Sequence, residues 1–136
     1  MKITTKGRYA LRVMIDLAQH EGEGFISLKA IADRQGISMK YLESIVSLLN
    51  KSGLLLSQRG KDGGYQLKNP VEEYTIGQIL KLSEGSLTPV ACLDYGTHNC
   101  EKSADCITLP MWQKLDAVIE DYLDSVTLRN LIERNV

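Results

Sequence analysis

Two short amphipathic segments joined by the tetrapeptide "QGIS" constrain the fold of this chain more than any other feature. Ser27 precedes "LKAIADRQ" and Ser38 precedes "MKYLESIVSLLNKSG", and serine is a favoured residue at helix N-caps. Gly36, inside the tetrapeptide, can adopt the positive φ of a tight turn. The pattern therefore predicts two helices that meet through a tight turn. The apolar face of the second helix is Leu42, Ile45, Val46 and Leu49.

The segments on either side of this helix pair complete a recognisable order. Residues 8–20 carry apolar side chains at helical spacing and predict a buried helix. Residues 54–67 predict a hairpin, with strands at 54–58 and 64–67 joined by a glycine-rich tip. Helix, helix, turn, helix and hairpin is the order of a winged helix-turn-helix, which is a DNA-binding fold. The expected fold class is therefore mainly α, with a small β-hairpin wing.

The helix after the turn would place its N-terminal end in the major groove of DNA. Ser38, Lys40 and Tyr41 lie at that end and can contact phosphates, helped by the helix N-terminus. Glu43 is repelled by phosphates unless it accepts a hydrogen bond, for which cytosine N4 is the natural donor. Glu43 is therefore either a specificity residue or a solvated surface charge.

Basic residues at the hairpin tip suit the minor groove. Arg59 and Lys61 flank a glycine there, and arginine is favoured where that groove is narrow; the alternative is a solvated basic tip. Residues 1–70 hold 11 Lys and Arg against 6 Asp and Glu, whereas residues 71–136 hold 5 against 11. This split fits a DNA-binding module followed by a sensing or assembly module, despite a net charge of −1. Lys6, in the basic half, is a further candidate DNA contact.

The acidic half is predicted to carry a long helix. Thr75 caps a short helix, Pro110 fits the first turn of a longer one over 109–125, and Thr127 caps a last short helix. The apolar stripe of the longer helix is too wide for a lone surface helix, so we expect it to pair with a second copy in a homodimer. The stripe consists of Met111, Trp112, Leu115, Val118, Ile119, Tyr122 and Val126.

All three cysteines, Cys92, Cys100 and Cys106, fall in one polar segment with the spacing Cys-x7-Cys-x5-Cys. Soft thiolates suit iron–sulfur clusters or zinc, although zinc sites usually contain closer cysteine pairs. A reversible disulfide between two of them is a rival interpretation. A cluster needs a fourth ligand. The donors within reach are His98, Asp94, Glu101 and Asp105.

Four stretches, "MKITTKGRYALRVMIDLA", "SLKAIADRQGISMKYLE", "LLNKSGLLLSQRGKDGGYQL" and "DSVTLRNLIE", resemble the dimeric winged-helix regulators of the IscR/CymR/NsrR family. The likeness covers nearly the whole chain, and the cysteine segment before "PMW" looks most like IscR. The resemblance implies a 2Fe–2S cluster held by the three cysteines. It also implies DNA contacts from Ser38, Tyr41, Glu43 and Arg59, with the glutamate choosing between operator classes.

The sequence departs from this family at the fourth ligand. In IscR-like members the ligand is a histidine three residues after the third cysteine, and that position is Leu109 here. NsrR-like members use an acidic residue at the start of the first helix, and that position is Arg8 here. His98, in the longer first cysteine gap, is therefore the first substitute to test, followed by the loop carboxylates.

The expected protein is a homodimeric DNA-binding transcription regulator that senses iron–sulfur cluster status; the alternative is a thiol-redox, nitric-oxide or zinc-responsive repressor. We expect a DNA-binding domain at 1–70, a connector helix with the cluster-binding loop at 71–107, and a dimerisation helix with a C-terminal helix at 108–136. The chain lacks a Cys-x-x-Cys motif, a nucleotide fingerprint and an acid/base pair, so we expect no enzyme activity. No membrane-spanning or secretory segment is evident, so a cytoplasmic location is expected.

Overall fold

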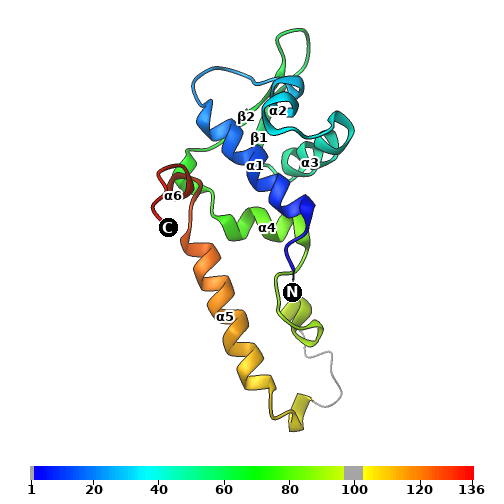
Figure 1. Ribbon diagram of the computed structural model, residues 1–136, viewed down its shortest axis with the longest axis vertical. Coiled ribbons are helices and arrows are strands. Elements are labelled where there is room, and N and C mark those ends of the chain that lie inside the picture. The colour runs from blue at the N-terminus through cyan, green and yellow to red at the C-terminus, as the bar shows by residue number, and fades with distance from the viewer. Residues whose placement is uncertain (1, 97–102) are drawn as a thin grey trace.

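The computed structural model describes residues 2–96 and 103–136. Figure 1 shows a helical head that carries the hairpin, and one long helix, α5, that extends away from it. In the described residues the helices are α1 (Thr5–Gln19), α2 (Leu28–Gln35), α3 (Met39–Lys51), α4 (Ile76–Glu84), α5 (Leu109–Ser125) and α6 (Leu128–Ile132). The strands are β1 (Leu55–Gln58) and β2 (Gly64–Leu67), and the short 3-10 turns are η1 (Val71–Glu73), η2 (Ala91–Gly96) and η3 (Ser103–Asp105).

Hydroxyl side chains begin the helices of the head. The predicted caps Ser27, Ser38 and Thr75 accept hydrogen bonds from backbone N–H groups in the first turns of α2, α3 and α4. Thr127 does the same for α6, where Asn130 completes a capping box. The first helix begins at Thr5 rather than near residue 8, because Thr4 caps it by accepting from the Gly7 N–H.

The core lies where α1, α2, α3 and α4 converge. Met14 of α1, Ile31 of α2 and Ile79 of α4 are completely buried there. The predicted apolar face of α3 is buried with them, since Leu42, Ile45, Val46 and Leu49 all belong to the same core cluster. Burial of this kind is the main favourable contribution to folding, and it fixes α3 against the rest of the head.

The hairpin is antiparallel, with Leu55 opposite Leu67 and Gln58 opposite Gly64. A third segment joins its edge, because Ile26 and Tyr65 exchange two backbone hydrogen bonds of 2.8 Å each. A side chain at Gly64 would bring its Cβ within 2.1 Å of the Ile26 carbonyl oxygen, so this close approach requires glycine. The hairpin is thereby tied to the residue just before the Ser27 cap of α2.

The buried hydroxyl of Tyr74 ties the exit of the hairpin to the head. It donates a 2.7 Å hydrogen bond to the Leu54 carbonyl oxygen and accepts from the N–H groups of Lys68 and Asn69 at 3.0 and 2.9 Å. Tyr74 is only 1% exposed, and its hydroxyl gives all three backbone groups a partner at this buried site. One side chain therefore holds both ends of the hairpin.

The C-terminal segment returns to the head beside the start of α4. Ile76 donates to the Val126 carbonyl oxygen at 2.8 Å, and Leu128 donates to the Tyr74 carbonyl oxygen at 3.0 Å. These bonds form an isolated antiparallel bridge between Thr75 and Thr127. The chain from α4 to α5 therefore begins and ends at the same place on the head. No helix in the described part of the chain is long and apolar enough to span a membrane.

Asp16 is the one buried charged side chain among the described residues. Its carboxylate accepts from both Arg34 Nε at 2.9 Å and Arg34 Nη2 at 2.7 Å, and from Gln35 Nε2 at 3.0 Å. Burial acts to raise the pKa of Asp16, but the bonds from Arg34 and Gln35 and the positive charge of Arg34 outweigh it and leave the pKa below its usual value. The contact fastens the end of α2 to the last turn of α1.

Replacing Asp16 by asparagine is expected to lower the free energy of unfolding by roughly 2 kcal/mol near neutral pH, because Arg34 loses its charged acceptor. The pKa of Asp16 is lower in the folded than in the unfolded protein, so this stabilisation is complete above an unfolded-state pKa of about 4 and is lost as pH falls through the folded-state pKa. Urea unfolding measures the free energy of unfolding of both proteins. The difference in this free energy between wild type and Asp16→Asn should become smaller in acid. A constant difference would contradict the assignment, and exposed Asp33→Asn is the control.

Candidate nucleic-acid interface and cysteine loop

The turn before α3 and the first turn of α3 are built as the sequence predicts. Gly36 adopts a left-handed conformation with φ of 66°, and the Ser38 hydroxyl accepts from the Tyr41 N–H at 3.3 Å. Lys40 and Glu43 are exposed, as expected for groups that meet a ligand. Tyr41 differs, since it is half-buried and packs against Tyr9 of α1.

The tip of the hairpin presents two exposed basic side chains, Arg59 and Lys61. Gly60 between them has a φ of +106°, which L side chains rarely adopt. A Cβ at Gly63 would lie 2.2 Å from the Gln58 carbonyl oxygen, so the tip closes tightly only with glycine there. The glycines thus let a short loop hold the arginine and the lysine out into solvent.

A groove of about 450 Å³ runs between α3 and the hairpin. Met39 near the start of α3 and Asn50 near its end line one wall, and Arg59 of the hairpin lines the other. The groove therefore brings Arg59 and α3 onto one face of the head, while Lys61 is not among its lining residues. Lys6 belongs to the first turn of α1, which lies beside α4 rather than beside the hairpin (Figure 1).

Other polar residues that line this groove were not predicted from the sequence. Lys29, in the first turn of α2, and Gln58, at the end of β1, both contribute. Asn50 could have been found, because it lies about three helical turns after Met39 and so shares its face of α3. Gln58 carries no such signal, since its place depends on how the hairpin bends.

The structure describes two of the three cysteines. Cys92 lies in η2 and Cys106 directly follows η3; both are half-buried and neither forms a disulfide. The Cys106 sulfur lies 3.4 Å from the Thr108 hydroxyl. Hydrogen bonding from this hydroxyl, with help from the backbone N–H groups of Thr108 and Leu109, lowers the pKa of Cys106. Cys106 is therefore biased towards the thiolate, which is the form that binds metals. Cys100, His98 and Glu101 lie outside the described residues.

The loop carboxylates that are described have different surroundings. Asp94 accepts a 2.7 Å hydrogen bond from the Ser86 hydroxyl and another from the Thr88 hydroxyl. These bonds, the one from Thr88 foremost, lower the pKa of Asp94, so it is ionised and already engaged. Asp105 lies in η3 and is exposed. Within residues 2–96 and 103–136, no group of three or more His, Cys, Asp or Glu side chains lies close enough to hold a metal ion.

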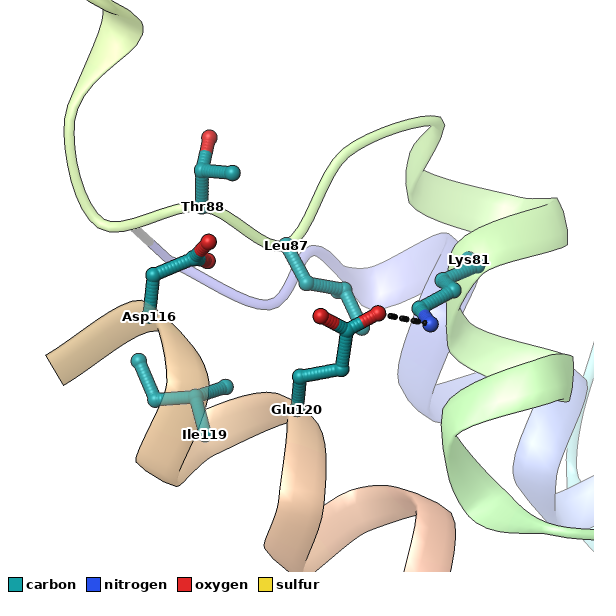
Figure 2. Close-up of a pocket in the computed structure, with 6 residues that line it drawn as sticks. All are labelled: Lys81, Leu87, Thr88, Asp116, Ile119 and Glu120. Atoms are coloured by element: carbon teal, nitrogen blue, oxygen red, sulfur yellow. Dashed lines mark hydrogen bonds and ion pairs between the residues drawn. The ribbon is translucent and has the colours of Figure 1, made fainter. Parts of the chain in front are cut away.

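A small cavity of about 70 Å³ lies where the start of this loop meets α5. Figure 2 shows Lys81 of α4 reaching Glu120 of α5, with Thr88 and Asp116 on the opposite, left-hand side of the view. Lys81 Nζ lies 2.6 Å from Glu120 Oε1 and 3.6 Å from Asp124 Oδ2. Burial, with the nearby charge of Glu120, raises the pKa of Asp116. The loop, α4 and α5 therefore meet through charged groups.

The apolar stripe of α5 divides into two faces. Trp112, Ile119 and Leu123 are half-buried, whereas Val126 is buried just past the end of the helix. The other face is uncovered, and no residue of α5 itself is buried in the described structure. Its exposed fractions are 54% for Met111, 40% for Leu115, 52% for Val118 and 56% for Tyr122. An exposed apolar row of this length marks an interaction surface.

The family of this fold is decided by a match over nearly the whole chain. The Rrf2 family, described as "Iron-dependent Transcriptional regulator", matches residues 3–134. The chain belongs to the Rrf2 family. The expected winged-helix fold and the resemblance to IscR and CymR are thereby confirmed.

Individual relatives agree with Rrf2 membership. The HTH-type transcriptional regulator IscR of Aliivibrio salmonicida is 38% identical over 135 residues, which cover 99% of this chain and 79% of that protein. The structure of CymR (YrzC), the global cysteine regulator of B. subtilis, matches with a TM-score of 0.81 at 39% identity and 98% coverage of both chains. T. potens IscR matches with a TM-score of 0.78 at 39% identity, covering 100% of this chain and 89% of that chain.

Rrf2 membership makes this chain a transcriptional regulator, and its regulator relatives are not enzymes. The two positions at which the sequence departs from IscR-like and NsrR-like members have ordinary structural roles here. Leu109 begins α5, directly before Pro110. Arg8 is exposed on α1 and donates to the Thr5 hydroxyl within the same helix.

Replacing Thr108 by valine is expected to raise the pKa of Cys106, because the main hydrogen bond to its sulfur is removed. Alkylation of Cys106 by iodoacetamide should then become severalfold slower near neutral pH, since the thiolate is the reactive form. The rate is measured with Cys92 and Cys100 both changed to serine. Thr5→Val in the same background is the control, since Thr5 is exposed at the start of α1. An unchanged pH–rate profile for Thr108→Val would contradict the role of the hydroxyl.

Proposed function

We propose that this Rrf2 protein is a homodimeric DNA-binding regulator whose operator affinity responds to the state of its cysteine loop. The observation that carries the DNA-binding part is the groove between α3 and the hairpin, which Arg59 of the hairpin and Lys29 of α2 both line. A basic groove beside an exposed helix N-terminus suits the backbone of a DNA duplex whose major groove receives α3. The head at 1–70, the connector and loop at 71–107 and the dimerisation part at 108–136 are the proposed functional units.

Each of the predicted DNA-contact residues has a proposed role. Ser38, Lys40 and Tyr41 contact phosphates at the edge of the major groove. Glu43, which is exposed one turn into α3, accepts from a cytosine N4 and so discriminates between operators. Arg59, Lys61 and Lys6 add basic contacts, with Arg59 entering the minor groove beside the bound helix.

Replacing Arg59 by alanine is expected to weaken binding to a selected operator by about tenfold, the equivalent of roughly 1.4 kcal/mol. The loss should be greatest on duplexes whose contacted minor groove is A·T-rich and narrow. Fluorescence anisotropy over a salt series measures both effects. Arg134→Ala removes the same charge from the exposed C-terminal end and is the control. Equal losses for the two variants would show that Arg59 acts only through net charge.

The uncovered face of α5 supports the homodimer. Met111, Leu115, Val118 and Tyr122 recur at helical spacing and remain 40–56% exposed, although apolar side chains in a row gain most from burial. A second copy offers the same row, so a two-fold interface is self-complementary. Two heads joined in this way would read two half-sites of one operator.

Changing both Leu115 and Val118 to lysine is expected to yield monomers, because like charges would have to be buried in the interface without partners of opposite sign. Sedimentation velocity at micromolar concentration measures the change. Gln113→Lys, also exposed on α5 but outside the apolar row, should leave the dimer intact. A double variant that still sediments as the wild-type dimer would overturn the assignment of this face.

We propose that Cys92, Cys100 and Cys106 hold an iron–sulfur cluster, with 2Fe–2S the leading type. The donor chemistry supports this, since the two described thiols are free of disulfides and Cys106 is biased towards the thiolate. His98 is the first candidate for the fourth ligand. Asp94 is a weaker one, because two hydroxyls already occupy its Oδ1 oxygen. A cluster held by these thiolates would be gained or lost with the supply of iron and with oxidation.

A thiol-redox, nitric-oxide or zinc-responsive repressor on the same scaffold is the alternative function. The structural likeness to a global cysteine regulator supports a sensor that works through its thiols alone. The lowered pKa of Cys106 fits this alternative equally well, because a thiolate is also the form that oxidises most readily.

Purification without oxygen distinguishes these alternatives. The cluster proposal expects a coloured protein with iron and sulfide, and expects both to be lost when the three cysteines are changed to alanine. A colourless protein with one zinc per chain would overturn it. His98→Ala should lose or alter the visible spectrum, with His20→Ala, the other histidine and outside the loop, as the matched control. An unchanged spectrum would move the fourth ligand to another residue.

The contacts of the loop suggest how its state could reach the DNA-reading heads. The hydroxyl of Thr88 binds Asp94, two residues after Cys92, and Thr88 also lines the cavity against Asp116 of α5. A change in the loop would therefore act on α5 at this contact. Because α5 would carry the dimer interface, a small shift there would change the spacing of the two heads.

A further inference from the structure

Arg12 of α1 holds the end of α2 at the point where the tight turn begins. Its Nε donates to the side-chain oxygen of Gln35 at 3.1 Å, and its Nη2 donates to the backbone carbonyl oxygen of Gln35. Gln35 is the last residue of α2, where backbone carbonyl groups lack partners within the helix and a positive charge is favourable. The same Gln35 donates through its amide to the buried Asp16.

The guanidinium of Arg12 also covers an aromatic ring. Its central carbon lies 5.1 Å from the ring centroid of Tyr9, which is within the range of cation–π attraction. Tyr9 in turn meets Tyr41 edge to face, with 5.7 Å between the centroids and 76° between the ring planes. Two side chains of α1 therefore connect the last residue of α2 to the third residue of α3.

This arrangement leaves Tyr41 in a different state from its neighbours. Lys40 and Glu43 are exposed, and no contact fixes them in the described structure. Tyr41 is half-buried, its N–H is bound to the Ser38 cap, and its ring rests on Tyr9. A side chain held on one side and open on the other loses little rotamer freedom when it meets a ligand.

We propose that Tyr9 and Arg12 are positioning residues for DNA recognition: they do not contact DNA but hold Tyr41 and the turn in the orientation that binds it. This inference rests on the proposed DNA-binding role of Tyr41. Arg12 acts through Tyr9 on the ring and through Gln35 on the turn, so both ends of the turn are set from α1. Arg8, one helical turn earlier, donates to the Thr5 hydroxyl within α1, and in the described residues no hydrogen bond or ring contact links it to the turn.

A double-mutant cycle tests the connection between Tyr9 and Tyr41. The probes are the tightest duplex that the wild type selects from a randomised library and a scrambled duplex of equal length. Tyr9→Leu and Tyr41→Leu should each weaken binding to the selected duplex by about fivefold, and the double variant should lose no more than the worse single one. Tyr9→Phe keeps the ring and should bind as wild type. Multiplicative losses in the double variant would overturn the proposal.

Matched arginine variants test whether Arg12 acts by position or by charge. Arg12→Gln and Arg8→Gln remove the same charge from the same helix. Arg12→Gln, and also the charge-retaining Arg12→Lys, should lower affinity for the selected duplex much more than for the scrambled one. Arg8→Gln should lower the affinity for the selected duplex and for the scrambled duplex by the same small factor. If Arg12→Lys binds as wild type, or Arg12→Gln and Arg8→Gln behave alike, the positioning role is wrong.

Two controls separate failure of this inference from failure of the proposed function. All affinities are measured well below the melting temperature of every variant, so that loss of binding does not report unfolding. If Tyr41→Leu binds the selected duplex as wild type, Tyr41 does not contribute to DNA binding. The proposed positioning of its ring is then wrong as well. If Tyr41→Leu weakens binding but Tyr9→Leu does not, the contact stands and the positioning role alone is overturned.

Discussion

The buried carboxylate of Asp16 is the interaction on which the DNA-reading head depends. It neutralises Arg34 and accepts a hydrogen bond from the Gln35 amide. The side-chain oxygen of Gln35 in turn accepts a hydrogen bond from Arg12. A charge in the interior costs several kcal/mol unless it is paired and hydrogen-bonded. In the described residues the side chains that meet Asp16 come from the end of α2 and from His20, directly after α1. Packing of the apolar core holds α1 and α2 together but provides no directional bond. The carboxylate adds directional bonds that fix the end of α2 on α1.

The local features of this fold could be predicted from the sequence. Serine and threonine caps, glycine turns and apolar spacing each act within a few residues, so the starts of α2, α3 and α4 and the range of α5 were correct. The non-local contacts could not be predicted. Nothing in the sequence around Tyr74 indicates that its hydroxyl reaches Leu54, and nothing around Ile26 indicates that it pairs with Tyr65.

In the candidate site, too, local features were predictable from the sequence and non-local contacts were not. Exposure of Lys40, Glu43, Arg59 and Lys61 followed from helical periodicity and from a glycine-rich tip. The half-buried state of Tyr41 did not, because it depends on where α1 crosses α3 and brings Tyr9 against the ring. The division of the α5 stripe into a covered and an uncovered face was likewise invisible in the sequence, since it depends on the packing of α4.

The bridge between Thr75 and Thr127 closes the chain from the start of α4 to the end of α5 into one large loop. α4 packs in the head, and backbone bonds hold the two ends of the loop together there. Residues can therefore be added or removed around the cysteines at little cost, about 0.6 kcal/mol for each doubling of loop length. Such an architecture lets the chemistry of detection diverge by insertion and deletion while the surface that reads DNA stays unchanged.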